Sequence, residues 1–360
     1  YQVSGAQTVL EYKDVIEAQL RTYLKSGFQL LSINDFTGQG YAPVGILDPF
    51  WNSKGLITPE KFREFCAPTV ALLRFPKRSY YNDEVFTGKA EVYNYSSSAL
   101  KSAKFKWWVT DESGKILKSG KLNTQNIGNN GVFPAGEFSY ALNGISAPQR
   151  LTVHLSVNNT INNSWDIWVY PRRDLKGLMQ STADVLYTTA FDAKAKQFLA
   201  EGKKVVLCPM PAKVIGRSSN FHNHFWNPIM FKWKPMTLGC LIHAEQKMFD
   251  NFITEKHLDW QWWDILAHAK VIEMDEAPRQ LRPFIQVIDS YETNHKLGIG
   301  FEAKVGNGKL MVLALDTKKE MEKRPATQQL LVSIDRYVKS GHFNPQVDVE
   351  ESFIESFLRK

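Results

Sequence analysis

Residues 27–40 have the sequence GFQLLSINDFTGQG, and the chain continues to DPFW at 48–51. The run 28–33 is almost continuously apolar, as expected of a strand that is buried on both faces. It ends in Asn34 and Asp35, followed by a threonine and two glycines, so polar side chains emerge at the carboxyl end of this strand. In α/β proteins, that end carries the loops that contact ligands. Together with a helix-like segment over 9–25, the stretch predicts one helix–strand step of a larger parallel sheet.

The longer sequence that starts here combines Gly, Trp, Phe and Pro in a rare pattern. Residues 28–78 are FQLLSINDFTGQGYAPVGILDPFWNSKGLITPEKFREFCAPTVALLRFPKR. This sequence resembles the end of the catalytic barrel in a bacterial group of glycoside hydrolase family 2-like proteins, which are β-galactosidase-like. The resemblance implies that residues 1–75 are the C-terminal end of a (β/α)8 barrel, a TIM-barrel remnant. In that group the two catalytic glutamates lie on earlier barrel strands, which this sequence lacks.

The composition is that of an ordinary globular protein, with 43% hydrophobic and 22% charged residues in 360. The net charge of +7 comes from scattered lysines and not from a block, so we expect a solvated basic surface and no nucleic-acid partner. No apolar run reaches the length of a membrane span, and no signal-peptide pattern is present. The three cysteines show no CxxC spacing, so neither a disulfide framework nor a zinc ribbon is predicted.

Two further domains are expected after the barrel end. Over 76–170, apolar and polar residues alternate in about six short strands; Phe105, Trp107 and Val109, for example, alternate with lysines. This pattern predicts an immunoglobulin-like β-sandwich without a disulfide. Over 171–345, strand-like and helix-like runs alternate, which predicts a mostly parallel, flavodoxin-like (doubly wound) sheet with helices on both faces. This last module resembles the glutamine-amidotransferase-like domain of several glycosidases, and residues 346–360 form a C-terminal tail.

The fold class is therefore predicted to be multidomain, α/β plus all-β. In the amidotransferase-like module, catalysis would need a cysteine on a tight strand-to-helix elbow. Cys208 is followed by Pro-Met-Pro, which cannot form that elbow, so we expect no amidotransferase activity. His222 and His224 are spaced for a metal, but no acidic or cysteine ligand is suitably placed, and packing is the favoured interpretation. We predict no metal and no cofactor.

The candidate substrate-binding residues are Asn34, Asp35 and Gln39, with Trp51 at the rim of the same pocket. Carboxylate and amide groups at the end of a barrel strand can hydrogen-bond sugar hydroxyls. The alternative is that Asn34 and Asp35 only cap a turn, as these residue types often do. Glu11, Asp14 and Glu17 are expected on one solvated helix face, so they do not form the opposed carboxylate pair that glycoside hydrolysis requires.

The sequence thus predicts an accessory C-terminal part of a β-glycosidase-like protein that is inactive by itself. Its partners would be an oligo- or polysaccharide substrate and either a second copy of the chain or an upstream catalytic segment. The resemblance implies a periplasmic or secreted location. A non-catalytic carbohydrate-binding or oligomerisation module is the alternative. A hydrolase that works from the α/β module is the third reading, which the lack of a nucleophile elbow disfavours.

Overall fold

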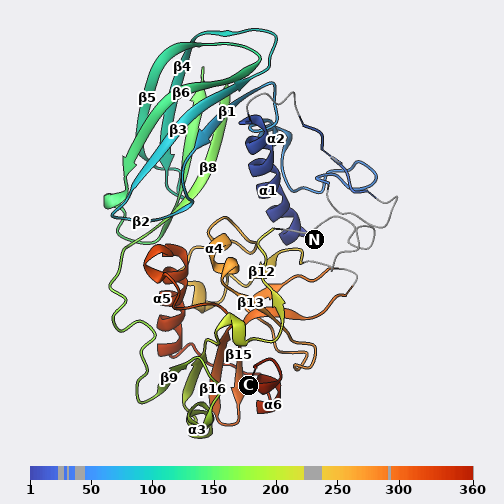
Figure 1. Cartoon of the computed structure of the whole chain (residues 1–360), viewed down its shortest axis with the longest axis vertical. Helices are drawn as coiled ribbons and strands as arrows, with labels where there is room; N and C mark the ends of the chain where they lie inside the picture. The colour runs from blue at the N-terminus through green and yellow to red at the C-terminus, as the bar shows by residue number, and fades with distance from the viewer. Residues whose placement is uncertain (23–27, 31, 37–44, 223–236, 291–292, 360) are drawn as a thin grey trace. The chain divides into compact units, whose positions relative to one another are not determined.

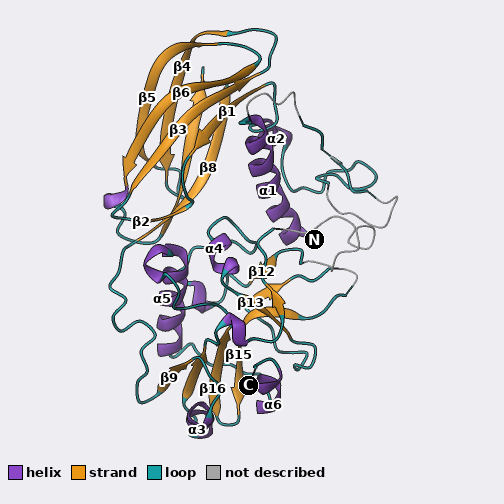
Figure 2. Cartoon of the chain, viewed as in Figure 1, coloured by secondary structure: helices purple, strands orange, loops and turns teal. Residues whose placement is uncertain are grey.

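The computed structural model describes residues 1–22, 28–30, 32–36, 45–222, 237–290 and 293–359. The chain divides into two compact units, one formed by Thr8–Arg172 and the other by Tyr1–Gln7 with Arg173–Lys360 (Figure 1). The first is mainly β-sheet, whereas the second combines helices with a sheet (Figure 2). The prediction of a multidomain protein with α/β and β parts is confirmed at this level.

The first unit contains two sheets, with strand orders β1-β3-β6 and β2-β8-β7-β4-β5. All pairings are antiparallel except that of β2 with β8. The elements are α1 (Gln2–Leu20, whose first residues belong to the second unit), α2 (Pro59–Arg63), β1 (Thr69–Arg74), β2 (Ser79–Tyr81), β3 (Val85–Asn94), β4 (Leu100–Thr110), β5 (Ile116–Ile127), β6 (Gly131–Ala141), the 3-10 turn η1 (Leu142–Gly144), β7 (Gln149–Val157) and β8 (Ile161–Tyr170).

The inward residues of these two sheets form one hydrophobic cluster. Phe105, Trp107 and Val109 of β4 are buried in it, as the alternation predicted, and Trp107 stacks on Phe138 of β6 with ring centroids 4.3 Å apart. Since β4 and β6 belong to different sheets, this contact joins them face to face. Period-two burial is the direct consequence of one face packing inward and the other facing water.

Strand β1 lies within residues 1–75, the range predicted to be the end of a barrel, but it belongs to the sandwich. It pairs with β3 along its whole length, from Thr69 opposite Asn94 to Arg74 opposite Lys89. Its sequence TVALLR shows no alternation because both faces are covered. One face enters the sandwich core, and Val70 and Leu72 on the other face pack with Ile16 of α1.

The predicted buried strand over 28–33 does not form. Its described residues are outside any strand, Ile33 is 36% exposed, and the neighbouring residues make only isolated bridges, such as Asn34 with Leu47. A strand needs a partner for its backbone N–H and C=O groups, and a parallel one also needs helices over it. Within the described part of the chain, no strand offers that pairing, so the apolar run becomes a loop.

The second unit has the elements β9 (Val185–Thr188), α3 (Ala193–Ala200), β10 (Lys204–Leu207), η2 (Pro211–Lys213), β11 (Arg217–Ser218), β12 (Cys240–Ile242), η3 (Lys247–Phe249), α4 (Trp262–Ala267), β13 (Lys270–Glu273), β14 (Ile285–Val287), β15 (Leu297–Val305), β16 (Gly308–Leu313), η4 (Met321–Lys323), α5 (Pro325–Lys339) and α6 (Glu351–Ser356). The main path of its sheet is β11-β13-β15-β16-β10-β9, and β14 and β12 branch from β15.

The prediction that this sheet is mostly parallel is wrong. Of the seven described pairings, only β9 with β10 and β10 with β16 are parallel. A parallel connection needs a crossover of a dozen or more residues, usually a helix. Among the described elements, only α3 provides such a helix between two strands that are neighbours both in sequence and in the sheet. Residues 245–252 are helix-like in sequence, but only the short 3-10 turn η3 forms there. The sequence Gly306-Asn307-Gly308 between two apolar runs is typical of a tight hairpin, and β15 and β16 form one, with Gly306 at φ +56° in its two-residue loop.

Helices cover both faces of the parallel part of this sheet (Figure 1). On one face, α3 and α6 contribute Leu199, Phe353 and Phe357 to a cluster with Phe301 of β15. The predicted tail is therefore part of the core of this unit. On the other face, α5 is linked to the sheet by hydrogen bonds from Tyr187 to Asp335 (2.7 Å) and from Tyr337 to Glu302 (2.8 Å).

Candidate functional site

Three of the four predicted substrate-binding residues lie in two described loop segments of the first unit, residues 32–36 and 45–54, which are hydrogen-bonded to each other. Asn34 and Asp35 are in the first segment and Trp51 is in the second, whereas Gln39 lies outside the described residues. The two segments are joined by Asp35 N–H donating to Leu47 O (3.0 Å) and by Ile46 N–H donating to Ile33 O (3.0 Å). These three residues therefore belong to neighbouring loop segments, and their role in substrate binding stays a prediction.

The Asp35 carboxylate is directed toward the second segment. It is only 2% exposed, accepts the Gly45 N–H (2.9 Å) and forms an ion pair with Lys54, whose side chain is equally buried. Lys54 also donates to Gly45 O (2.8 Å). Asp35 and Lys54 thus form an internal clasp that joins the described segments 32–36 and 45–54. The sequence left two interpretations of Asp35 open, turn capping and sugar contact. This geometry matches capping, and sugar contact by Asp35 stays a prediction.

Asn34 is engaged in the same local structure. Its side-chain oxygen accepts from the Ser32 hydroxyl (2.6 Å), and its amide nitrogen donates to Asp35 O (3.2 Å). Gly45 lies so close that a Cβ atom at that position would be 2.3 Å from the Asn34 carbonyl carbon. Only glycine permits this approach, so the identities of these residues follow from the packing of the loop.

The outer end of the loop is a tight turn that displays two aromatic side chains. The Asp48 carboxylate accepts N–H groups from Phe50 and Asn52 (2.8 Å each) and the Asn52 side-chain amide (3.0 Å). Trp51 has φ +68°, a conformation that bulky residues rarely adopt, and its N–H donates to Asp48 O (3.0 Å). Phe50 is 83% exposed and Trp51 65% exposed. We call residues 48–52 the aromatic turn.

Phe50 was not singled out from the sequence. The available signal was the Asp-Pro pair that starts a turn directly before two aromatic residues, which places large apolar side chains at a position that usually carries polar ones. A cavity of about 540 Å³ also opens on this loop, lined mainly by apolar residues that include Ile46, Leu47 and Phe62. The loop therefore offers apolar surface both in a cavity and on the exposed turn.

The structure offers less support for the metal and cysteine sites that the sequence suggested. Among the described residues, no three His, Cys, Asp or Glu side chains are grouped as for a metal; His224 lies outside them. Burial raises the pKa of the Cys208 and Cys240 thiols to about 12, so neither is a thiolate at neutral pH. None of the described helices is long and apolar enough to cross a membrane.

Two family models match the chain, and both are described as domains of unknown function. Residues 84–171 match DUF8488, and residues 186–359 match DUF8487. These ranges correspond to most of the sandwich and to most of the second unit. No curated protein matches the chain.

Solved structures give only partial likenesses. A Pseudomonas fluorescens alkylpurine DNA glycosylase, AlkC, aligns with 29% of this chain and 31% of its own length, at 14% identity and a TM-score of 0.25. The CARDB domain of a Pyrococcus furiosus protein aligns with 29% of this chain and 94% of its own, at 11% identity and a TM-score of 0.23. A Parabacteroides merdae β-glucuronidase aligns with 39% and 21%, at 15% identity and a TM-score of 0.21. At such scores these likenesses establish neither a shared fold nor a function.

Proposed function

We propose that this chain is an accessory, non-catalytic part of a family 2-like glycoside hydrolase, and that its aromatic turn contacts carbohydrate. The proposal starts from the resemblance of residues 28–78 to the end of a glycosidase barrel. The observation that carries it is the display of Phe50 and Trp51 on a turn that is fixed by Asp48 and, at its base, by the Asp35–Lys54 clasp.

Aromatic side chains suit a sugar ligand because their flat apolar faces can cover the C–H faces of a pyranose ring. Ordering a side chain at a binding site costs about 0.5–1.5 kcal/mol, and a backbone that is already fixed lowers such costs. The positive φ of Trp51 is a strained conformation that the turn maintains through three hydrogen bonds to Asp48 side-chain oxygens. Strain that a local network maintains is typical of functional positions.

The finer fold assignments belong to the same proposal. We take residues 28–36 with α1 and α2 as the last step of a (β/α)8 barrel, whose preceding strands would supply the backbone partners that this segment lacks among the described residues. The two-sheet sandwich would be immunoglobulin-like, and the parallel β9–β10–β16 part of the second unit would be a remnant of a flavodoxin-like, amidotransferase-like domain. The setting would be periplasmic or secreted.

The test combines activity with binding. We expect the purified chain to hydrolyse none of a panel of aryl α- and β-glycosides, and to bind one or more members of a panel of neutral oligosaccharides in affinity electrophoresis or calorimetry. Trp51→Ala is expected to weaken that binding at least about tenfold, which is about 1.4 kcal/mol. Trp263→Ala is the matched control, because Trp263 is also exposed (52%) but belongs to the second unit.

Three outcomes would refute the proposal, and a fourth would favour the alternative. Turnover of a glycoside by the chain, with the expected intact mass and no contaminating hydrolase, would show that a catalytic carboxylate pair is present. Equal loss of binding in Trp51→Ala and Trp263→Ala, or no binding to any oligosaccharide, would remove the aromatic turn as a sugar contact. Oligosaccharide binding that Trp51→Ala leaves intact would favour the alternative of a carbohydrate-binding module with a different surface.

A further inference from the structure

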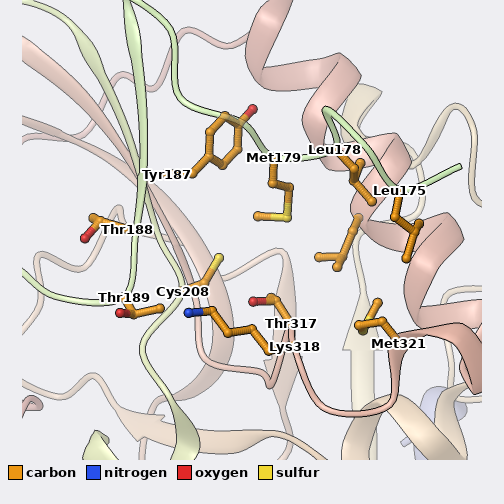
Figure 3. Close-up of a pocket in the computed structure, with 11 residues that line it drawn as sticks. Leu175, Leu178, Met179, Tyr187, Thr188, Thr189, Cys208, Thr317, Lys318 and Met321 are labelled. Carbon is orange, nitrogen blue, oxygen red and sulfur yellow. The ribbon is translucent and has the colours of Figure 1, made fainter.

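The second unit contains a cavity of about 470 Å³ at the carboxyl edge of its parallel strands (Figure 3). β9 ends in Thr188, which lines the cavity with Thr189, and β10 leads directly into Cys208. The chain after β16 contributes Thr317 and Lys318. The carboxyl edge of parallel strands is where open α/β sheets place their ligands, and the volume lies within the range of about 300–1,000 Å³ of small-molecule sites.

The lining has two chemically different sides. Leu175, Leu178, Met179, Met321 and Leu331 form an apolar side, and Met321 and Leu331 are themselves buried. The opposite side carries the threonine hydroxyls and Lys318, which is the one cationic residue among the described residues of the lining. The described lining contains no carboxylate. Figure 3 shows the Lys318 side chain extending toward Cys208 and Thr189.

The segment that presents Thr317 and Lys318 is held in place from within. The Asp316 carboxylate accepts the N–H groups of Lys318 and Lys319 (2.9 Å each). Arg324, which is 4% exposed, donates to Asp316 O (2.8 Å) and to the Asp264 carboxylate (2.8 Å). The backbone that presents Thr317 and Lys318 is therefore fixed without a ligand, which lowers the cost of ordering this side of the cavity on binding.

The charge of Lys318 is not neutralised by the described part of the chain. Among the described residues, no carboxylate lies within ion-pair distance of its ammonium group, whereas Lys196, Lys203 and Lys323 each form an ion pair. The neighbouring thiol does not compensate, since burial raises the pKa of Cys208 to about 12 and keeps it neutral. Asp335, on the adjacent helix, is already engaged by Tyr187 and by Lys339 (2.8 Å).

We propose that this cavity binds a small organic acid, with its carboxylate on Lys318 and the threonine hydroxyls and its aliphatic or aromatic body against the leucines and methionines. A single cation with hydroxyl donors suits one carboxylate, whereas a polyphosphate would call for several cations or arginine forks. A metal complex is disfavoured because the described lining holds no carboxylate or histidine. The site lies in the second unit and does not depend on the carbohydrate proposal.

The probe for this site is 4-phenylbutyrate, which combines one carboxylate with an apolar body, compared with its neutral analogue 4-phenylbutyramide. We expect titration calorimetry to show one saturable site per chain for the acid and at least about tenfold weaker binding for the amide. Lys318→Met is expected to weaken the acid about tenfold and to leave the amide unchanged. Lys319→Met is the matched control, because this lysine is adjacent, exposed and absent from the lining, and should change affinity less than about twofold.

A second variant tests whether the ligand occupies this cavity, and it leaves the charge of Lys318 unchanged. Thr189→Phe introduces a large side chain at the exposed mouth, so the fold should persist while both probes lose binding. Failure of the acid to bind the wild-type chain, or equal effects of Lys318→Met and Lys319→Met, would overturn the proposal. Undiminished binding in a folded Thr189→Phe variant would do the same, because the ligand would then occupy another site.

Discussion

Replacing Glu17 by glutamine should destabilise the first unit strongly. The sequence predicted Glu11, Asp14 and Glu17 on a solvated face of α1, but Glu17 is 2% exposed and Glu11 is 7% exposed. The Glu17 carboxylate is buried because α1 packs against the sandwich on this side. The expectation of a solvated face was therefore wrong for two of the three residues.

Four side chains donate hydrogen bonds to this carboxylate. One oxygen accepts from Lys13 and from Asn163 (2.9 Å), and the other accepts from Arg21 (2.7 Å) and from the Trp165 indole (2.9 Å). Glutamine keeps the shape but offers only one acceptor oxygen, so two donors would face an NH₂ group. Hydrogen bonds to charged groups contribute about 1.5–3 kcal/mol each, which gives a loss of about 3–6 kcal/mol. Removal of one member of a buried ion pair costs a similar amount, about 3–5 kcal/mol.

The assay is urea unfolding followed by tryptophan fluorescence, with hydrogen exchange and mass spectrometry to locate the effect. With a slope of about 2 kcal/mol per molar urea, a loss of 4 kcal/mol would move the midpoint of one transition by about 2 M. Peptides from α1 and β8 should lose protection, whereas peptides from β9 to β16 should not. Because the chain has two compact units, the two transitions are fitted separately.

The control is Glu91→Gln, which removes a partly exposed carboxylate that pairs with Arg74 in the same sandwich. Surface ion pairs contribute less than about 1 kcal/mol to the free energy of unfolding, so this variant should unfold at almost the same urea concentration as the wild type. If Glu17→Gln costs no more than Glu91→Gln, the buried network does not stabilise the unit and the reasoning is wrong.

The pH dependence gives an independent check. Burial alone would raise the pKa of Glu17, but Lys13, Arg21 and the hydrogen bonds outweigh it and hold the pKa below its ordinary value. A carboxyl group whose pKa is depressed by folding contributes its full stability above its unfolded pKa, about 4.3, and loses it as the pH falls through the folded pKa. The difference between wild type and Glu17→Gln should therefore be largest near pH 7 and narrow below about pH 4. A constant difference over this range would contradict the assignment.

Three further predictions follow from the structure. Lys54→Met leaves the Asp35 carboxylate buried without its cation and should destabilise the first unit by about 3–5 kcal/mol in urea unfolding; the double variant with Asp35→Asn should recover part of the loss, and no recovery would argue against the clasp. At pH 8, a Cys66→Ser variant, which lacks the half-buried third thiol, should resist a thiol-specific disulfide reagent until denaturant is added, because burial raises the pKa values of Cys208 and Cys240 to about 12; rapid labelling of this variant in its native state would contradict the prediction. Phe353→Ala should cost the second unit about 3–5 kcal/mol in thermal or urea unfolding, and a cost under 1 kcal/mol would show that α6 is dispensable.

The sequence alone determined the elements whose signals are local. Alternation with period two specified the sandwich strands, because each exposes one face to water. Thr58 followed by Pro59 is a typical helix-start sequence, and α2 begins there, with the Thr58 hydroxyl accepting the Lys61 N–H (3.3 Å). The glycine-containing loop between β15 and β16 predicted a hairpin because few residues tolerate a positive φ there.

Tertiary structure alone decided which apolar runs became strands and which direction they took. Thr69–Arg74 became a strand because β3 supplies its hydrogen bonds and α1 covers its outer face, whereas 28–33 has no such neighbour among the described residues. Whether two strands pair in parallel or antiparallel orientation likewise depended on which distant segments of the chain became neighbours in the sheet.

The candidate sites divide in the same way. Asn34, Asp35 and Trp51 were found together because they are close in sequence, but the burial of Asp35 depends on Lys54, nineteen residues away. The cavity in the second unit is lined by segments that range from Leu175 to Leu331 in the sequence, so no local sequence pattern predicts it. Local sequence fixes backbone preferences and periodicity, whereas burial, ion pairing and cavities arise only when distant side chains pack around the same point.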